Sequence, residues 1–167
     1  MTAIQNVLIP TDFSTTSDAA LRHAVTMART FGARLYVLHV PGRTGENFEA
    51  NFPIGQFERL ASEKLALLLS PEEIAQLKPE YALRIGAPAD EIVQYAKTRD
   101  VDLIVMGTHG RSGVAHLLLG SVAEHVVRMA PCPVLLVRSL KSGSAKFSER
   151  PSIDATPLLS ENSTNVV

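Results

Sequence analysis

Residues 101–121, VDLIVMGTHGRSGVAHLLLGS, join a strand-like run to a connection of unusual composition. The run Val101–Met106 is almost continuously apolar, which is typical of a strand that is buried on both faces of a parallel sheet. The connection Gly107–Ser121 then contains four glycines, together with His109 and Arg111. So much backbone freedom directly after a buried strand indicates a loop with a task beyond reversing the chain.

Strand-length apolar runs alternate with segments of helical periodicity in both directions from this stretch. We predict strands at 6–9, 34–40, 80–85, 101–106 and 134–137. We predict helices at 14–31, 56–69, 88–98 and 121–130, with a short extra helix that opens at 70–73. This alternation is typical of an α/β fold, in which right-handed crossovers build a parallel sheet with helices on both faces. We therefore expect one five-stranded domain over residues 1–139, followed by a polar, disordered tail at 140–167.

Charge and composition exclude several classes of partner. The 167-residue chain has 16 Lys and Arg against 17 Asp and Glu, so it offers no basic surface field that would attract a nucleic acid. No apolar run is long enough to cross a membrane, and the N-terminal residues carry no signal peptide, which predicts a cytoplasmic protein. Cys132 is the only cysteine and no metal-ligand spacing is present, so we expect a small buried thiol and no protein-bound metal.

The predicted fold indicates where a ligand binds. Open parallel sheets bind ligands beyond the carboxyl ends of their strands, where the strand order reverses. Two predicted connections stand out chemically at that edge: Pro10–Ser14 after the first strand, and Gly107–Ser121 after the fourth. If those two strands are neighbours, both connections face one crevice.

The glycines of the second connection suit an anion. Gly107 lets a ligand approach the backbone without a Cβ in the way, and Gly110 and Gly113 permit the positive φ that turns successive N–H groups inward. Gly120 opens the next helix, and the first free N–H groups of that helix, at Ser121–Ala123, form a second anion site. The loop therefore suits phosphate. It contains neither a dinucleotide fingerprint nor a Walker loop.

Structural explanations remain open for the same residues. Ser121–Glu124 fits a capping box, which alone would account for the serine and the glutamate. Arg111 is equally explained as a solvated cation, and His109 as a hydrogen-bonding residue within its own loop. Asp12 suits either the N-terminal region of a helix or a ribose hydroxyl, whereas we interpret His39 as structural.

Four ordered blocks resemble the nucleotide-binding branch of the universal stress protein family. Gly107-x2-Gly110-x9-Gly120-Ser121 matches the G-x2-G-x9-G-[ST] signature of that branch. The other three blocks are an apolar strand with a Pro-x-Asp-x-Ser turn, a G-x-P-x-x-x-I element, and a closing A-P-C-P-V-L-[LV]-V. They are similar to Val7–Ser14, Gly86–Ile92 and Ala130–Val137, and the likeness runs from about Ile4 to Arg138.

The resemblance implies a Rossmann-like sheet of the adenine nucleotide alpha hydrolase type, with strand order 3-2-1-4-5. It also implies ATP, or ADP or AMP, in the crevice, with any Mg²⁺ carried in by the nucleotide. By position, Asp12 would meet the ribose, while Pro10 and Val40 would flank the adenine. The full set of implied nucleotide contacts is Pro10, Thr11, Asp12, Val40, Met106, Gly107, Thr108, His109, Gly110, Arg111, Ser112, Gly113, Gly120, Ser121, Val122 and Ala123. This chain has Phe13 where many relatives place a glycine after the aspartate.

Three functions fit this pattern. The first is a nucleotide-binding stress or signalling protein whose occupancy changes its affinity for a protein partner. The second is a slow ATPase or phosphotransferase; we assign no catalytic residue, because the loop offers no carboxylate to hold a metal at the terminal phosphate. The third is a fold that binds only protein partners. In each case the apolar fifth strand, Pro133–Val137, would lie at a sheet edge, and we expect a homodimer formed through it.

Overall fold

The computed structural model describes residues 3–41, 54–108 and 119–138. The predicted tail at 140–167 and part of the glycine-rich connection lie outside these ranges. In chain order the elements are β1 (Asn6–Thr11), α1 (Thr15–Phe31), β2 (Arg34–His39), α3 (Ile54–Ala66), α4 (Pro71–Leu77), β3 (Glu80–Leu83), α5 (Pro88–Thr98), β4 (Leu103–Gly107), α6 (Ser121–Met129) and β5 (Val134–Val137).

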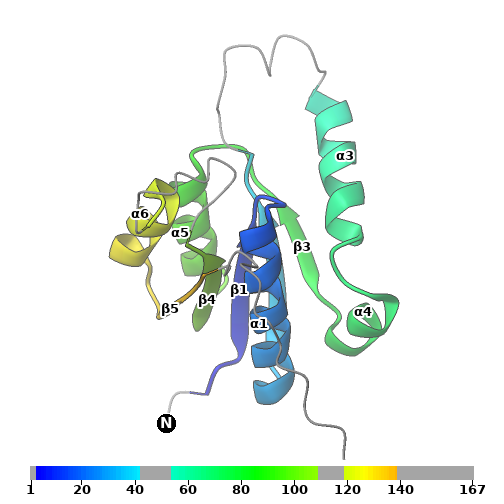
Figure 1. The fold of residues 1–167 in the computed structure, drawn as a ribbon, viewed down its shortest axis with the longest axis horizontal. Helices are drawn as coiled ribbons and strands as arrows, with labels where there is room; N and C mark the ends of the chain where they lie inside the picture. Colours follow the sequence, from blue (N-terminus) through cyan, green and yellow to red (C-terminus); the bar gives the residue numbers. More distant parts are fainter. Residues whose placement is uncertain (1–2, 42–53, 109–118, 139–167) are drawn as a thin grey trace, which may run out of the picture.

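The described strands form one parallel sheet in the order β3-β2-β1-β4-β5 (Figure 1), which confirms the predicted order. Strand side chains alternate between the two faces of the sheet. On one face Val7, Ile9 and Val105 pack with buried residues of α1, and on the other Leu8, Ile104 and Met106 pack with buried residues of α5 and α6. Helices therefore cover both faces, as the strand–helix alternation predicted.

β1 continues two residues beyond its predicted end. Pro10 and Thr11 still pair with Leu38 and His39 of β2, whereas the register with β4 stops at Leu8. A proline is tolerated here because the ladder on the β4 side has already ended. Pro10 and Thr11 thus belong to the strand, and the turn proper begins at Asp12.

Helix ends follow local signals in the sequence. Gly32 ends α1 in the left-handed conformation, with φ +63°, as its position after the last periodic residue predicted. Pro88 begins α5, where its fixed φ suits the first helical turn. In α6 the predicted apolar face is only partly correct, because Ala123 and Val126 are buried but Val127 is 46% exposed.

Candidate functional site

The turn after β1 and the end of β4 lie together at the carboxyl edge of the sheet. β1 and β4 are neighbours, and Gly107, the last residue of β4, packs against the first turn of α1. A Cβ built on Gly107 would lie 2.8 Å from Thr16 Cγ2 and 3.2 Å from the Thr16 carbonyl carbon and oxygen. The two predicted connections therefore begin side by side, which is the arrangement that a shared crevice needs.

This contact corrects the reason given for a glycine at position 107. The sequence suggests that the missing Cβ leaves room for a ligand, but Thr16 occupies that space. Glycine is favoured because a Cβ here would fit only if the helix and the strand moved apart. A ligand contact with the main chain of Gly107 stays a prediction. Thr16 itself was missed, because its sequence neighbourhood marks it only as a helical residue.

Two hydrogen bonds fix the ends of the glycine-rich connection. The Gly120 N–H donates to the Thr108 carbonyl at 2.8 Å, and the Thr108 N–H donates to the Val137 carbonyl at 3.0 Å. The residue that follows β4 is thereby joined to the residue that precedes α6. This arrangement brings the first turn of α6 to the end of β4, although eleven residues separate Thr108 from Gly120 in the sequence.

Part of the predicted site cannot be placed. Residues 109–118 lie outside the described ranges, and with them the predicted anion nest. The site residues affected are His109, Gly110, Arg111, Ser112 and Gly113.

The capping-box explanation of Ser121 is wrong. Gly120 is the N-cap of α6, with φ −72° and ψ 152°, and no side chain caps this terminus. Ser121 is the first helical residue, one position too late to cap, and Glu124 pairs instead with Arg128 at 2.9 Å. The first hydrogen bond of the helix runs from the Glu124 N–H to the Gly120 carbonyl, so the N–H groups of Ser121–Ala123 have no acceptor within α6. Such a terminus attracts anions.

Asp12 shapes the turn that it begins. Its Oδ1 accepts a hydrogen bond from the Ser14 N–H at 3.1 Å, and Ser14 in turn caps α1 by accepting from the Ser17 N–H at 3.2 Å. Thr11 Oγ1 accepts from the Phe13 N–H at 3.1 Å and lies 3.2 Å from Ser17 Oγ. The carboxylate of Asp12 is only partly buried at the carboxyl edge of the sheet. It is thus both a turn former and a group at the predicted crevice.

Phe13 has a backbone conformation that a bulky residue rarely adopts. Its φ is +62°, in the left-handed region. Conformations of this kind cost on the order of 1–3 kcal/mol and persist only where the surroundings impose them. The Phe13 ring packs on the His39 imidazole, with centroids 4.5 Å apart, and Lys64 Nζ of α3 lies 5.6 Å from its centroid. The sequence marked Phe13 only as a departure from the family pattern, because φ is not visible in a sequence.

His39 connects the two central strands, which supports its predicted structural role. It is 5% exposed, and its Nδ1 lies 2.7 Å from the Thr11 carbonyl oxygen, within hydrogen-bonding distance. β2 therefore helps to hold the end of β1 directly before Asp12. The same ring also supports Phe13 through the tilted ring contact described above.

Apolar residues of the predicted nucleotide contact set form a wall on one face of the sheet. Val40, Met106 and Ala123 are all buried and belong to the core cluster between the sheet and α5 and α6. Val122 packs against this cluster and is half-buried. Pro10 is also buried, in the last part of β1. The N-terminus of α6 and these apolar side chains thus lie on the same side of the sheet.

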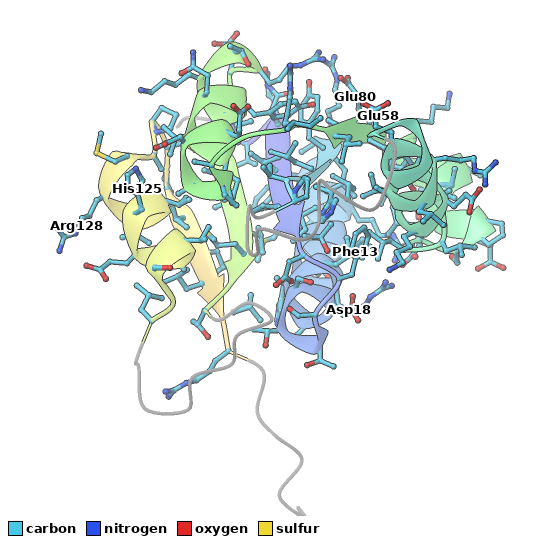
Figure 2. The ribbon with its side chains drawn as sticks, turned by 90° about the horizontal axis from the view of Figure 1, so that it is seen from above. Phe13, Asp18, Glu58, Glu80, His125 and Arg128 are labelled. Atoms are coloured by element: carbon cyan, nitrogen blue, oxygen red, sulfur yellow. The ribbon has the colours of Figure 1, made fainter. Side chains whose placement is uncertain are left out.

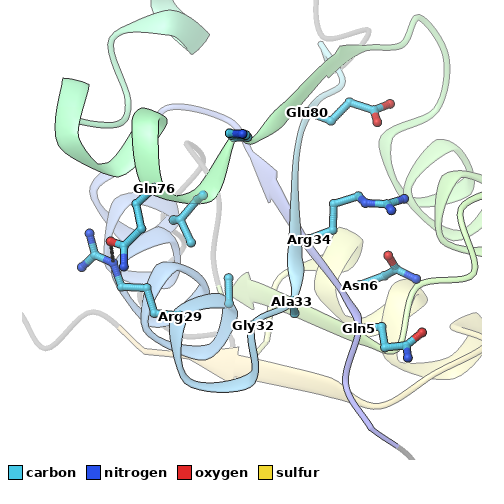
Figure 3. A pocket seen from close by; sticks show the side chains of 11 residues that line it. Gln5, Asn6, Arg29, Gly32, Ala33, Arg34, Gln76 and Glu80 are labelled. Carbon is cyan, nitrogen blue, oxygen red and sulfur yellow. Dashed lines mark hydrogen bonds between the residues drawn. The ribbon is translucent and has the colours of Figure 1, made fainter.

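A polar hollow of about 840 Å³ lies at the opposite, amino-terminal edge of the sheet (Figure 3). The last turns of α1 and α4 line it, and the C-terminal ends of helices carry the negative end of the helix dipole. Arg29 donates to Gln76 at 2.9 Å and Arg34 to the Tyr36 hydroxyl at 3.2 Å. Because of these dipoles and engaged guanidinium groups, the hollow is a poor phosphate site.

The described ranges contain no group of three or more His, Cys, Asp or Glu side chains arranged to hold a metal ion. Within the same ranges, no helix is both long and apolar enough to cross a membrane. Cys132 is partly buried, and this burial raises the pKa of its thiol, which keeps it protonated and weakly nucleophilic. This agrees with the prediction that Cys132 is structural.

Comparison with known proteins matches residues 3–138 to the Universal stress protein family. Universal stress protein MJ0531 of Methanocaldococcus jannaschii is 35% identical over 149 residues, which cover 82% of this chain and 84% of that protein. A universal stress protein of Thermus aquaticus is 40% identical over 141 residues, covering 80% of this chain and 98% of the relative.

Solved structures of this family share the fold. The structure of MJ0577, also from Methanocaldococcus jannaschii, has a TM-score of 0.72 and 30% identity, covering 84% of this chain and all of that one (100%). A universal stress protein in complex with cAMP has a TM-score of 0.58 and 28% identity, covering 83% and 100%. The Archaeoglobus fulgidus protein in complex with dAMP has a TM-score of 0.55 and 25% identity, covering 81% and 99%.

Proposed function

Because the chain belongs to the universal stress protein family, we propose that it binds an adenine nucleotide, ATP in the first instance, and acts as a stress-response or signalling module. Occupancy of the site would change the affinity of the protein for a partner without driving turnover. Of the carboxylates near this site, Glu124 pairs with Arg128, Asp90 Oδ1 lies 3.2 Å from His125 Nε2, and Asp12 accepts a hydrogen bond from the Ser14 N–H. Nothing in the described site therefore favours the slow ATPase over the binding protein.

The hydrogen bond between the Gly120 N–H and the Thr108 carbonyl carries this proposal. It sets the N-terminus of α6 beside the end of β4, next to the turn that contains Asp12. The proposed crevice would then present main-chain N–H donors, a carboxylate and an apolar wall. These three features match the three parts of an adenylate: phosphate, ribose and base.

The ligands of the relatives support an adenine nucleotide. cAMP and dAMP, which are bound in two universal stress protein structures, share an adenine, a sugar and a phosphate. In this chain the N–H groups of Ser121–Ala123 would receive phosphate oxygens, and Asp12 would accept from a ribose hydroxyl. Val40 and Met106 would contact the base. Any Mg²⁺ would enter with the phosphates, whose oxygens are the ligands that it prefers.

Isothermal titration calorimetry with ATP, ADP, AMP and cAMP tests the proposal on protein freed of any co-purified nucleotide. We expect saturable binding at one site per chain. Replacing Gly120 by valine should abolish binding, because the branched side chain would stand among the N–H donors. Ala75→Val, on the exposed surface of α4, is the matched control and should bind normally.

Release of inorganic phosphate from ATP, measured on the same protein, separates the two leading functions. Binding with fewer than one turnover per hour would support the signalling module, and sustained release would support the ATPase. Failure of every adenine nucleotide to bind would refute both and leave a protein-binding fold. Unchanged affinity in Gly120→Val would refute the assignment of the phosphate site.

A further inference from the structure

Phe13 connects the proposed nucleotide site to α3. Its backbone lies between Asp12 and the N-cap Ser14, at the start of α1 (Figure 2). Its ring contacts His39 of β2 on one side and Lys64 of α3 on the other. A single residue thus contacts the Asp12 turn, the strand that leads to the proposed adenine wall, and a helix that follows much later in the sequence.

The conformation of the Asp12 turn depends on these ring contacts. A phenylalanine at φ +62° is unfavourable in isolation, so the hydrogen bonds of the turn and the contacts of the ring together hold the backbone there. Two hydrogen bonds flank Phe13 in this conformation of the turn: its own N–H donates to Thr11 Oγ1, and the Ser14 N–H donates to Asp12 Oδ1. The orientation of the Asp12 carboxylate therefore depends on where the Phe13 ring is held.

Residues 58–66 of α3 bury few side chains, which leaves this part of the helix able to respond. Of the α3 side chains that the structure describes, only Ala61 and Leu65 are buried. Elements with few buried apolar contacts open and shift at low free-energy cost. The outward face of α3 presents Glu58, Arg59 and Glu63 to solvent, with Arg59 and Glu63 paired at 3.6 Å. A shift of α3 would present this charged face differently to a partner.

We infer that Phe13 is a positioning residue that couples occupancy of the Asp12 turn to the placement of α3, an inference that rests on the proposed nucleotide binding. A nucleotide that engages Asp12 favours the turn that Phe13 maintains, and this turn keeps the ring in place under Lys64. The coupling is reciprocal: whatever holds α3 against Phe13 raises nucleotide affinity, and the nucleotide restrains α3 to the same degree.

Hydrogen–deuterium exchange of the full-length protein, with and without saturating ATP, measures this coupling directly. We expect ATP to slow exchange in residues 11–17 and also in 54–66. Phe13→Gly keeps the turn accessible, because glycine adopts positive φ without strain, but removes the ring. In this variant we expect about 5- to 20-fold weaker ATP binding and no effect of ATP on exchange in 54–66.

Lys64→Met removes the cation above the ring and retains an unbranched apolar stem of similar length. Because Lys64 is exposed, this variant should fold normally, and we expect about 2- to 5-fold weaker ATP binding with a smaller response of α3. Lys97→Met makes the same change on the exposed surface of α5 and should leave both the affinity and the response unchanged.

The outcomes separate coupling from a purely structural role. If Phe13 and Lys64 only stabilise the fold, their loss will raise exchange in 54–66 equally with and without ATP, and the inference is refuted. It is also refuted if ATP binds the unmodified chain by calorimetry but leaves exchange in 54–66 unchanged. A chain that binds no adenine nucleotide at all would overturn the proposed function first, and this inference with it.

Discussion

Gly107 and Gly86 are both crowded, but by neighbours of different kinds. A Cβ at Gly107 would meet the methyl group of Thr16 at 2.8 Å and the Thr16 main chain at 3.2 Å. A Cβ at Gly86 would meet only the side chain of Glu91, with Oε1 at 2.6 Å and Cγ at 2.8 Å. A flexible side chain can rotate away, whereas the backbone of a helix cannot move without disturbing its packing.

The alanine variants of these glycines should therefore differ in stability. We expect Gly107→Ala to lower the free energy of unfolding by about 1–3 kcal/mol, since α1 and β4 must separate to admit the methyl group. Gly86→Ala should change it by less than about 1 kcal/mol, because Glu91 can adopt another rotamer. Urea denaturation of the two variants measures the difference, and equal losses would contradict the packing role of Gly107.

The site residues show what could be predicted at this scale. The location of Gly107 and Asp12 near one edge of the sheet could be predicted, because both residues follow strands whose carboxyl ends meet at that edge. The sequence could not reveal that Thr16 fills the space beside Gly107 or that Phe13 adopts a positive φ. Both facts depend on contacts between segments that only the folded chain brings together.

Two identical local patterns behave differently at the level of whole elements. Ser70-Pro-Glu-Glu73 and Ser121-Val-Ala-Glu124 both follow the Ser-x-x-Glu pattern, yet only the first forms a capping box. At α4 Ser70 and Glu73 exchange hydrogen bonds at 2.9 and 3.2 Å, and Arg22 of α1 pairs with Glu73 without disturbing the cap. At α6 the Gly120 N–H is bonded to the Thr108 carbonyl, and the N-cap is Gly120, one residue before the Ser121 that the pattern indicates. Local pattern alone therefore could not determine where α6 begins.

The charge of Glu73 provides a prediction at the element scale. Its hydrogen bond to the Ser70 N–H, together with Arg22 at 3.3 Å and Arg29 at 3.9 Å, lowers the pKa of the carboxyl below its ordinary value of 4.5. A pKa that is lower in the folded state means that stability is present above pH 4.5 and is lost as the pH falls through the folded-state pKa. Glu73→Gln, which can still reach the Ser70 N–H, removes only the charge.

At pH 7 we expect the free energy of unfolding of Glu73→Gln to be about 0.5–1 kcal/mol lower than that of the unmodified chain. This gap should close toward pH 3. Thermal unfolding of both proteins across this range measures the gap. Glu72→Gln, an exposed residue of the same turn, is the control and should show a smaller difference. A gap that persists undiminished at low pH would mean that the carboxylate charge is not its source.

The molecule as a whole leaves β5 at an edge of its sheet. The carbonyls of Pro133 and Val137 accept from β4, each at 3.0 Å, so by alternation the main-chain groups of Val134 and Leu136 face away from the sheet. An apolar edge of this kind is a template for pairing with another strand. The exposed Val127 of α6 adds apolar surface on the helix that precedes β5.

We therefore propose a homodimer in which β5 pairs with its copy, and expect two chains of 18.0 kDa to sediment together at micromolar concentration. Val134→Pro removes an outward N–H at the first position of the strand, where proline is tolerated, and should shift the protein toward monomer. Sedimentation of the unmodified protein as a monomer at this concentration would contradict the proposal.

The strand order of the whole molecule was predictable because four sequence blocks match one family in order and spacing. Strand lengths and helix starts were less predictable. β3 ends at Leu83 instead of the predicted Ile85, and the Arg84 N–H makes the last hydrogen bond to β2. Such ends are set by where neighbouring strands diverge, which is a property of the assembled sheet. The anion nest at residues 109–113 lies outside the described ranges and stays a prediction.

The central claim, that main-chain amides hold the phosphates of an adenine nucleotide, is tested most directly by NMR. Backbone amide shifts of the ¹⁵N-labelled protein would be followed during titration with ATP and, separately, with adenosine. We predict large shifts at Ser121, Val122 and Ala123 with ATP and far smaller ones with adenosine, because only the former brings phosphate to those N–H groups. Equal shifts with both compounds at these amides, or ATP-induced shifts confined to the amino-terminal hollow around Arg34 and Lys78, would contradict it.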